Sequence, residues 1–266
     1  MASFDDLPPC QDLTDQVKKL ERGSIASGGF SDVYIGEWTN PAGSKLKVAI
    51  KALRVSRITG EAERLNKLNS RLRRESKLWH QLDHPNVLTF LGLVSSPSYG
   101  LIPALISPYC GRGSVLDFIK KDPSVERLPI IIGIAKGLQY LHSQDVVHGD
   151  LKAQNVLMSD SGTPLLSDFG RSKFIATRGY TTVFTGTGRY LAPEILSCGM
   201  SDREDSDATV TPLKSSSPTD SPDESPPISP SEPSTTKQTD VYAFALIGVE
   251  FVSRSSLDVH VFILMA

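Results

Sequence analysis

The sequence lacks the features that mark secreted, membrane and nucleic-acid-binding proteins. It has only 3 cysteines in 266 residues, spaced neither as a disulfide framework nor as a zinc site. The formal net charge of −2 gives no general attraction to nucleic acid or to anionic lipid. The first residues, MASFDDLPPC, have no apolar core of a secretory signal, and no apolar run reaches the length of a membrane span. We therefore expect an intracellular protein, in the cytoplasm or the nucleus, that binds neither nucleic acid nor membrane.

Apolar residues are also scarce in one internal stretch, Ser201–Thr236, which consists mostly of Ser, Thr, Pro, Asp and Glu. Such a stretch cannot bury enough apolar surface to offset its ordering entropy, so it is predicted to be disordered. Its Ser-Pro pairs suit proline-directed phosphorylation, and a solvated spacer explains them equally well. The chain as a whole has 39% hydrophobic residues, which is enough for a folded core.

The stretch Val146–Leu157, reading VVHGDLKAQNVL, sets polar side chains at fixed offsets between two apolar pairs. The apolar pairs indicate short buried strands, so the polar residues should lie on a rigidly held loop. On such a loop the carboxylate of Asp150 can accept a hydroxyl proton, and the amide oxygen of Asn155 can bind Mg²⁺. A plain polar turn between strands fits the same pattern, so the neighbouring motifs decide between the two.

Two runs rich in β-forming residues, Asp32–Trp38 and Lys45–Leu53, precede this loop, and the second contains Val-Ala-Ile-Lys ending at Lys51. A lysine that closes an apolar strand can be a simple edge charge. A lysine that holds phosphates needs a carboxylate partner, and Glu75 is the candidate because it lies late in a helical stretch, Thr59–Leu82. The glutamates in the first turn of that stretch are better placed to offset the helix dipole.

Further motifs follow the polar loop. A strand-like run leads into Asp168-Phe169-Gly170, and the segment GTGRYLAPE ends at Glu194. An apolar helix is predicted at Asp240–Val252, where a plain helix N-cap is one interpretation of Asp240. Other strands are predicted at Val87–Val94 and Leu101–Ile106, and other helices at Ser114–Lys120 and Pro129–His142.

In their order and spacing these motifs resemble those of protein kinases: Val-Ala-Ile-Lys, a helix glutamate, H-x-D-x-K-x-x-N, Asp-Phe-Gly and Ala-Pro-Glu. The sequences of these motifs are most similar to those of the tyrosine-kinase-like group of serine/threonine kinases. The chain departs from the family pattern in two places. Gly149 replaces the arginine of the H-R-D motif, and the segment SIASGGFSDVYIG keeps only Gly28 of the three motif glycines.

The resemblance implies an α+β fold of two lobes, a small β-rich N-lobe and a mainly helical, incomplete C-lobe. It divides the chain into a flexible lead-in at 1–16, the N-lobe at 17–106, a hinge at 107–113, the partial C-lobe at 114–252 with the insert 199–237, and an atypical tail at 253–266. It also implies that Asp240 holds the backbone of the polar loop from below, which is the alternative to the N-cap.

The resemblance further implies transfer of the γ-phosphoryl group of Mg-ATP to Ser/Thr hydroxyls of protein substrates. Asp150 would orient the acceptor hydroxyl, and Lys152 would steady the γ-phosphate, with Thr187 as a further catalytic-site residue. Asn155 and Asp168 would hold Mg²⁺. The ATP site would contain Lys51 braced by Glu75, together with Asp168, Ile25, Ala26, Gly28, Val33, Ala49, Ser107, Tyr109, Cys110 and Leu157.

Gly149 replaces an arginine that in the family commonly meets a phosphorylated activation segment. We therefore expect activity to depend weakly on phosphorylation of the candidate acceptors Thr177, Thr181, Thr182 and Thr185.

Two alternatives to catalysis stay open, and the oligomeric state is left undetermined. The eroded glycine-rich loop and the absence of counterparts for the last C-lobe helices favour a pseudokinase, whereas the intact polar residues oppose it. A truncated fragment that folds poorly is the other alternative, because Glu194 would lack its arginine partner and a partly buried, unpaired carboxylate is costly.

Overall fold

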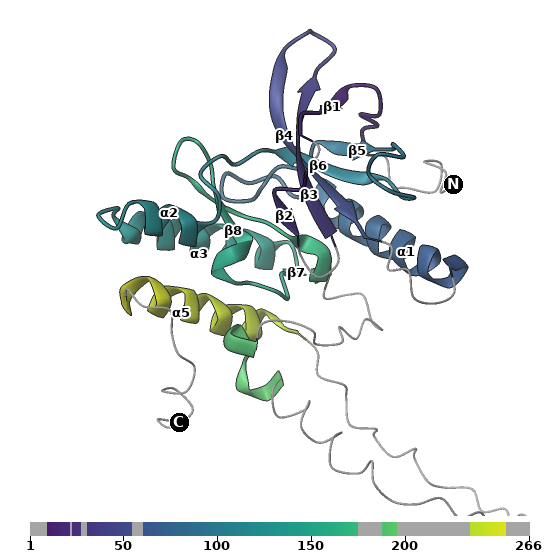
Figure 1. The fold of residues 1–266 in the computed structure, drawn as a ribbon. Helices are drawn as coiled ribbons and strands as arrows, with labels where there is room; N and C mark the ends of the chain where they lie inside the picture. Colours follow the sequence, from purple (N-terminus) through teal and green to yellow (C-terminus); the bar gives the residue numbers. More distant parts are fainter. Residues whose placement is uncertain are drawn as a thin grey trace, which may run out of the picture.

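The computed structural model describes residues 10–21, 23–27, 31–54, 61–174, 188–195 and 235–253. They form a β-sheet with one long helix and, below it in Figure 1, a group of helices. This arrangement confirms the expected α+β fold, with a β-rich small lobe and a mainly helical large lobe. Gly28, Thr187, the candidate phosphate-accepting threonines and most of the Ser/Pro insert lie outside the described residues.

The small lobe is built on an antiparallel sheet with the strand order β1-β3-β4-β6-β5, and β2 pairs with the start of β3. Its strands are β1 (Val17–Lys19), β2 (Ala26–Ser27), β3 (Ser31–Thr39), β4 (Lys45–Leu53), β5 (Gly92–Val94) and β6 (Ala104–Pro108). The two predicted strands that became β3 and β4 are confirmed. The prediction at Val87–Val94 is too long, because Val87 bridges Leu166 instead of joining the sheet.

The chain segment before β1 belongs to the small lobe. The Leu13 N–H donates to the carbonyl of Leu93 at 2.8 Å, and the Leu93 N–H donates to the carbonyl of Gln11 at 2.9 Å. Leu13 is fully buried in the same apolar cluster as Val48 and Ile50. The expectation of a flexible lead-in is therefore wrong for residues 10–16. A single leucine in a polar segment carries no periodic signal that could have indicated this contact.

Helix α1 (Glu61–His80) packs against the sheet and supplies much of the lobe's core. Leu72, Leu78 and Trp79 are buried, and the Trp79 indole N–H donates to the carbonyl of Leu88. The spacing of these apolar residues follows the helical period, which is why the helix was predictable at Thr59–Leu82. The helix thereby carries its buried face, including Glu75, toward the junction of the two lobes.

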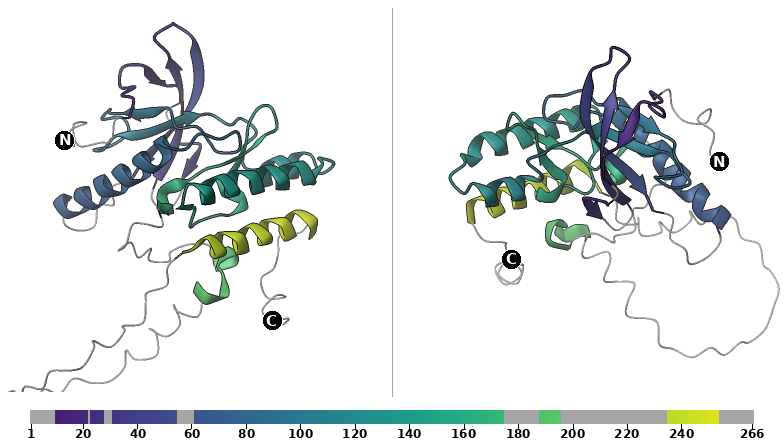
Figure 2. Two further views of the ribbon diagram at one scale, coloured as in Figure 1. Left: turned by 180° about the vertical axis from the view of Figure 1, so that it is seen from behind. Right: turned by 45° about the horizontal axis from the view of Figure 1, so that its top comes forward.

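The large lobe is organised around α3 (Arg127–Ser143) and also contains α2 (Val115–Lys121) and α5 (Lys237–Ser253). α5 runs alongside α3 in both views of Figure 2. A Cβ on Gly137 of α3 would lie 2.7 Å from the carbonyl oxygen of Asn86, so only glycine permits this approach. None of the described helices is both long and apolar enough to cross a bilayer.

Four short strands pair as two ladders that pack against α2 and α3 of the large lobe. β7 (Val146–Val147) pairs with β10 (Lys173–Phe174), and β8 (Val156–Met158) pairs with β9 (Pro164–Leu166). The chain between β7 and β8 is the polar loop, and the chain between β9 and β10 contains Asp168. The two ladders hold both loops at their ends, and the short buried strands on either side of the polar loop confirm the prediction made from its apolar pairs.

Candidate active site

Lys51 on β4 forms an ion cluster with two acidic residues from other parts of the chain. Its Nζ lies 2.6 Å from Oε1 of Glu75 on α1 and 2.7 Å from Oδ1 of Asp168. The side chain of Glu75 is 1% exposed and that of Lys51 is 15% exposed, so the pair is largely removed from water. The expected pairing of Lys51 with Glu75 is confirmed, and the edge-charge interpretation of this lysine is wrong.

The cluster keeps Lys51 and Asp168 ionised. Burial acts to lower the pKa of Lys51, but the neighbouring carboxylates of Glu75 and Asp168 outweigh it, so the pKa is raised above its ordinary value. The charge on Lys51 in turn holds the pKa of Asp168 well below its usual range, against the opposing effect of burial. A fixed positive charge and an ionised carboxylate thus sit side by side, as a site for a metal-bound polyphosphate requires.

The segment around Asp168 is tightly constrained. Asp168 has a left-handed backbone with φ 65°, which a non-glycine residue adopts only where its surroundings hold it. A Cβ on Gly170 would lie 2.8 Å from Nη2 of Arg71 and 3.1 Å from Oε2 of Glu75, so any side chain there would press on α1. Phe169 is buried, with its ring centroid 5.6 Å from that of Trp79 and 5.6 Å from that of His148.

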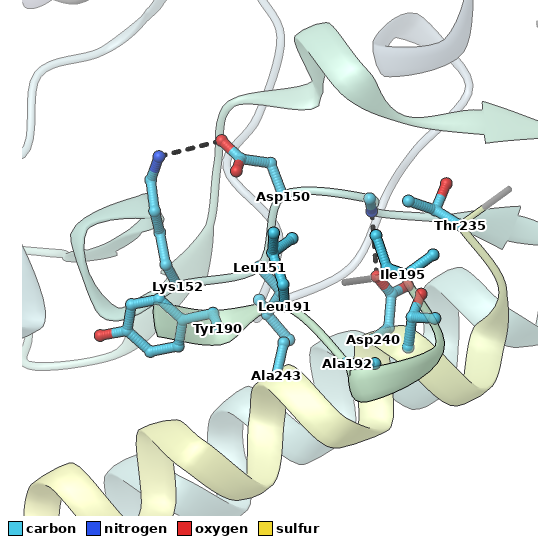
Figure 3. Close-up of a pocket in the computed structure, with 12 residues that line it drawn as sticks. Asp150, Leu151, Lys152, Tyr190, Leu191, Ala192, Ile195, Thr235, Asp240 and Ala243 are labelled. Carbon is cyan, nitrogen blue, oxygen red and sulfur yellow. Dashed lines mark hydrogen bonds and ion pairs between the residues drawn. The ribbon is translucent and has the colours of Figure 1, made fainter. Parts of the chain in front are cut away.

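Asp240 on α5 holds the backbone of the polar loop. Its carboxylate accepts hydrogen bonds from the N–H of His148 at 2.8 Å and of Gly149 at 2.9 Å, and His142 lies 3.0 Å away. Figure 3 shows the hydrogen bond from the N–H of Gly149 to Asp240 beside the loop. The helix begins at Lys237, so the N-cap interpretation of Asp240 is wrong. The interpretation that this residue supports the loop from below is confirmed.

Gly149 occupies a position that excludes larger residues. Its φ is +75°, and a Cβ there would lie 2.9 Å from the carbonyl oxygen of Arg171. A side chain would therefore be strained by the backbone conformation and by the contact together. The substitution of glycine for the family's arginine thus has a local structural reason in this chain.

On the same loop, Asp150, Lys152 and Asn155 converge. Nζ of Lys152 donates to Oδ2 of Asp150 at 3.0 Å (Figure 3), and Nδ2 of Asn155 donates to the carbonyl of Asp150 at 2.8 Å and to its Oδ2 at 3.2 Å. Nη1 of Arg171 lies 4.0 Å from Oδ1 of Asp150. Arg171 is not among the predicted site residues, and in the sequence only its position directly after Gly170 points to this site.

Asn155 and Asp168 offer oxygen ligands for a hard cation. Ser167 donates its N–H at 2.9 Å and its hydroxyl at 2.8 Å to the carbonyl of Asn155, which ties the residue before Asp168 to the loop. The amide nitrogen of Asn155 faces Asp150, so its amide oxygen is left for a ligand. Among the described residues no three acidic, histidine or cysteine side chains form a metal cluster, so phosphate oxygens would have to complete the coordination. The residues present therefore fit Mg²⁺ bound together with a nucleotide.

The remaining predicted ATP-site residues line the sheet and the connection between the lobes. Val33 lies opposite Lys51 and Ala26, and Ala49 lies opposite Ser107. Ile25 and Ala26 are exposed, Leu157 on β8 is half-buried, and Ser107 is buried. These residues are thus distributed over the strands that border the junction of the lobes.

The predicted hinge is more constrained than the sequence indicated. The Tyr109 N–H already donates to the carbonyl of Lys47 at 3.0 Å, so this group is not free for an adenine edge. Cys110 is buried, and burial, aided by the Asp160 carboxylate, raises the pKa of its thiol to about 11. This cysteine is therefore a packing residue rather than a nucleophile.

A small hollow opens beside Asp150 and Lys152, bordered by residues of the segment 190–195 and by α5 (Figure 3). Much of its wall is apolar, with contributions from Leu151, Leu191, Ala192, Ile195 and Ala243. Glu194, in the same segment, is exposed. The expected cost of burying this carboxylate without a partner therefore does not arise.

This geometry agrees with a comparison against known families. The model of the protein kinase domain matches residues 21–208, and the chain belongs to that family.

Relatives with similar sequences are serine/threonine kinases. The chain is 33% identical over 185 residues to serine/threonine-protein kinase STY46 of Arabidopsis thaliana, covering 68% of this chain and 30% of that protein. It is 32% identical over 192 residues to serine/threonine/tyrosine-protein kinase HT1 of the same plant, covering 70% and 47%. It is 31% identical over 149 residues to mitogen-activated protein kinase kinase kinase 13-A of Xenopus laevis, covering 54% and 15%. The chain thus spans less than half the length of these relatives.

Proposed function

We propose that this chain transfers the γ-phosphoryl group of ATP to serine or threonine hydroxyls of protein substrates. The observation that carries the proposal is the presence of two adjoining charged groups of residues. Lys51, Glu75 and Asp168 form the first, and Asp150 with Lys152 and Asn155 forms the second. The first suits a polyphosphate, and the second suits the hydroxyl that attacks it.

In the proposed reaction, Asp150 accepts the hydrogen of the substrate hydroxyl. This contact directs the oxygen of the hydroxyl at the γ-phosphorus. Lys152, which donates to Asp150 at 3.0 Å, offsets the negative charge that spreads over the transferred group. Lys51 holds the α- and β-phosphates, and Glu75 keeps its ammonium aimed at them. These residues contribute positioning and charge neutralisation, which are the main components of catalysis in phosphoryl transfer.

Asn155 and Asp168 would hold Mg²⁺ in this reaction. The ion, when bound with the nucleotide, neutralises charge on the β- and γ-phosphates. The adenine would lie between the sheet and the large lobe, near Ala49 and Leu157. Further residues proposed for the ATP site are Ile25, Ala26, Gly28, Val33, Ser107, Tyr109 and Cys110.

The substrate class follows from two residues. Lys152, two positions after Asp150, and Thr187 in the segment GTGRYLAPE both favour serine and threonine over tyrosine as acceptors. The relatives' names, which describe serine/threonine kinases, support the same class. We propose that these substrates are intracellular proteins.

The test is a transfer assay with radiolabelled ATP, Mg²⁺ and dephosphorylated casein. It compares the purified chain with its Asp150→Asn variant and with Asp83→Asn, an exposed carboxylate away from the site. Loss of the base should lower transfer by at least about 10²-fold, and Asp83→Asn should leave it unchanged. Equal transfer by the wild-type chain and Asp150→Asn would refute the proposal. Thermal stabilisation by Mg-ATP without any transfer would instead indicate a pseudokinase.

A further inference from the structure

The carboxylate of Asp150 has two oxygens, and the loop residues described above serve only one of them. Oδ2 accepts hydrogen bonds from Lys152 at 3.0 Å and from Asn155 at 3.2 Å. Oδ1 faces Arg171, whose Nη1 is 4.0 Å away. Both side chains are largely buried, at 18% exposed for Asp150 and 14% for Arg171. An ion pair at this distance acts through less water than a surface pair and is less screened by salt.

We infer that Arg171 is a positioning residue for Asp150, and this inference rests on the function proposed above. Its guanidinium sets the rotation of the carboxylate from the Oδ1 side, while Lys152 and Asn155 set it from the Oδ2 side. The 4.0 Å separation leaves Oδ1 able to accept the hydrogen of an incoming hydroxyl. A carboxylate held from both sides presents this oxygen in one orientation, which favours reaction.

The backbone holds Arg171 above the loop through contacts on both sides of it. Ser172 donates its hydroxyl to the carbonyl of His148 at 2.8 Å, and Lys173 pairs with Val147 in the β7–β10 ladder. The carbonyl oxygen of Arg171 lies only 2.9 Å from the position that a Cβ on Gly149 would take. The glycine thus makes room for Arg171, and the arginine sits beside the carboxylate because residue 149 has no side chain.

Arginine suits this role better than lysine. Its planar, rigid fork keeps its charge in a fixed direction, whereas an ammonium is a point charge on a flexible stem. Arg171 approaches the acceptor side of the site, and the phosphates are held from the other side by Lys51. Its removal should therefore lower kcat and leave the KM for ATP nearly unchanged.

The experiment measures kcat and the KM for ATP of Arg171→Gln, Arg171→Lys and a control, Lys120→Gln, which removes an exposed charge on α2. A displacement of the base by 1 Å costs on the order of 10²-fold, so Arg171→Gln should lower kcat about 10- to 100-fold. Arg171→Lys should recover part of this loss, and Lys120→Gln should match the wild-type chain. Wild-type kcat in Arg171→Gln would overturn the inference, as would an equal loss in Arg171→Lys and Arg171→Gln.

A second measurement does not depend on turnover. Melting temperatures of Arg171→Gln, Asp150→Asn and the double variant form a cycle that isolates their interaction. If the two residues pair, the double variant should lose less than the sum of the two single shifts. Additive shifts would overturn the inference even if the wild-type chain transfers no phosphate. Absence of transfer by the wild-type chain would refute the proposed function itself, so the two failures are distinguishable.

Discussion

Replacement of Lys51 by methionine should destabilise the fold more strongly than replacement of its partner Glu75 by glutamine. Lys51→Met removes the cation 2.6 Å from a carboxylate that is 1% exposed. Removing one partner of a buried ion pair costs about 3–5 kcal/mol, because the remaining charge is left uncompensated. Oε2 of Glu75 is buried without a hydrogen-bond partner among the described residues, so no hydrogen bond to this oxygen offsets that charge.

The matched variants separate the burial of a charge from the loss of packing. Glu75→Gln leaves Lys51 paired with Asp168 at 2.7 Å, so its cost should be smaller, about 1–2 kcal/mol. The double variant Lys51→Met/Glu75→Gln removes the uncompensated carboxylate and should be more stable than Lys51→Met alone. If the double variant is more stable than Lys51→Met alone, the destabilisation by Lys51→Met comes from the unpaired charge of Glu75 and not from lost packing.

Thermal unfolding followed by far-ultraviolet circular dichroism measures these differences. For a domain of this size, 1 kcal/mol corresponds to about 2–4 °C, so Lys51→Met should melt about 6–20 °C below the wild-type chain. Additive losses in the double variant would refute the reasoning. So would a melting temperature of Lys51→Met equal to that of the wild-type chain.

Three further predictions follow from other parts of the chain. Leu13→Ala should lower the free energy of unfolding in urea by about 2–5 kcal/mol, whereas Leu20→Ala, at a position that is 49% exposed, should leave it almost unchanged. Equal effects would contradict the packing of the N-terminal segment against the sheet. Because the pKa of Asp168 is depressed in the folded chain, its ionisation contributes stability that is present above about pH 4, the pKa of the unfolded chain, and is lost as the pH falls below that value. Asp168→Asn should therefore weaken the loss of stability below about pH 4, and an unchanged loss would contradict this prediction. Alanine substitution of the candidate phosphate acceptors should leave transfer activity largely intact; these are Thr177, Thr181, Thr182 and Thr185. Abolished activity in a phosphate-transfer assay would contradict the weak dependence on activation-segment phosphorylation that is expected from Gly149.

The sequence was informative where chemistry imposes both residue type and spacing. Glu75 could be assigned because a lysine that holds phosphates needs a carboxylate partner, and Lys51 and Asp168 could be assigned from the family motifs that contain them. The helices α1 and α3 were predictable from apolar periodicity over many residues. Their ends were not, since α3 begins two residues before the predicted Pro129 and α5 begins three before Asp240.

The sequence was uninformative where a contact depends on two distant segments meeting. Leu13 is buried only because Gly92 lets the N-terminal backbone approach, with the carbonyl of Gln11 2.2 Å from where a Cβ would be. Arg171 reaches Asp150 only because Gly149 leaves space for its backbone. Neither pairing produces a local pattern, so periodicity and motif spacing could not reveal it.

The contact between Trp79 and Phe169 gives this chain an intrinsic optical reporter. The indole of Trp79 on α1 is tilted against the ring of Phe169, with the two ring centroids 5.6 Å apart, so any displacement of the Phe169 ring changes the environment of the fluorophore. The other tryptophan, Trp38, lies on β3, and its indole N–H donates to Gln16. A Trp38→Phe variant would therefore emit from a single site next to Phe169, and its emission would follow nucleotide binding without an added label.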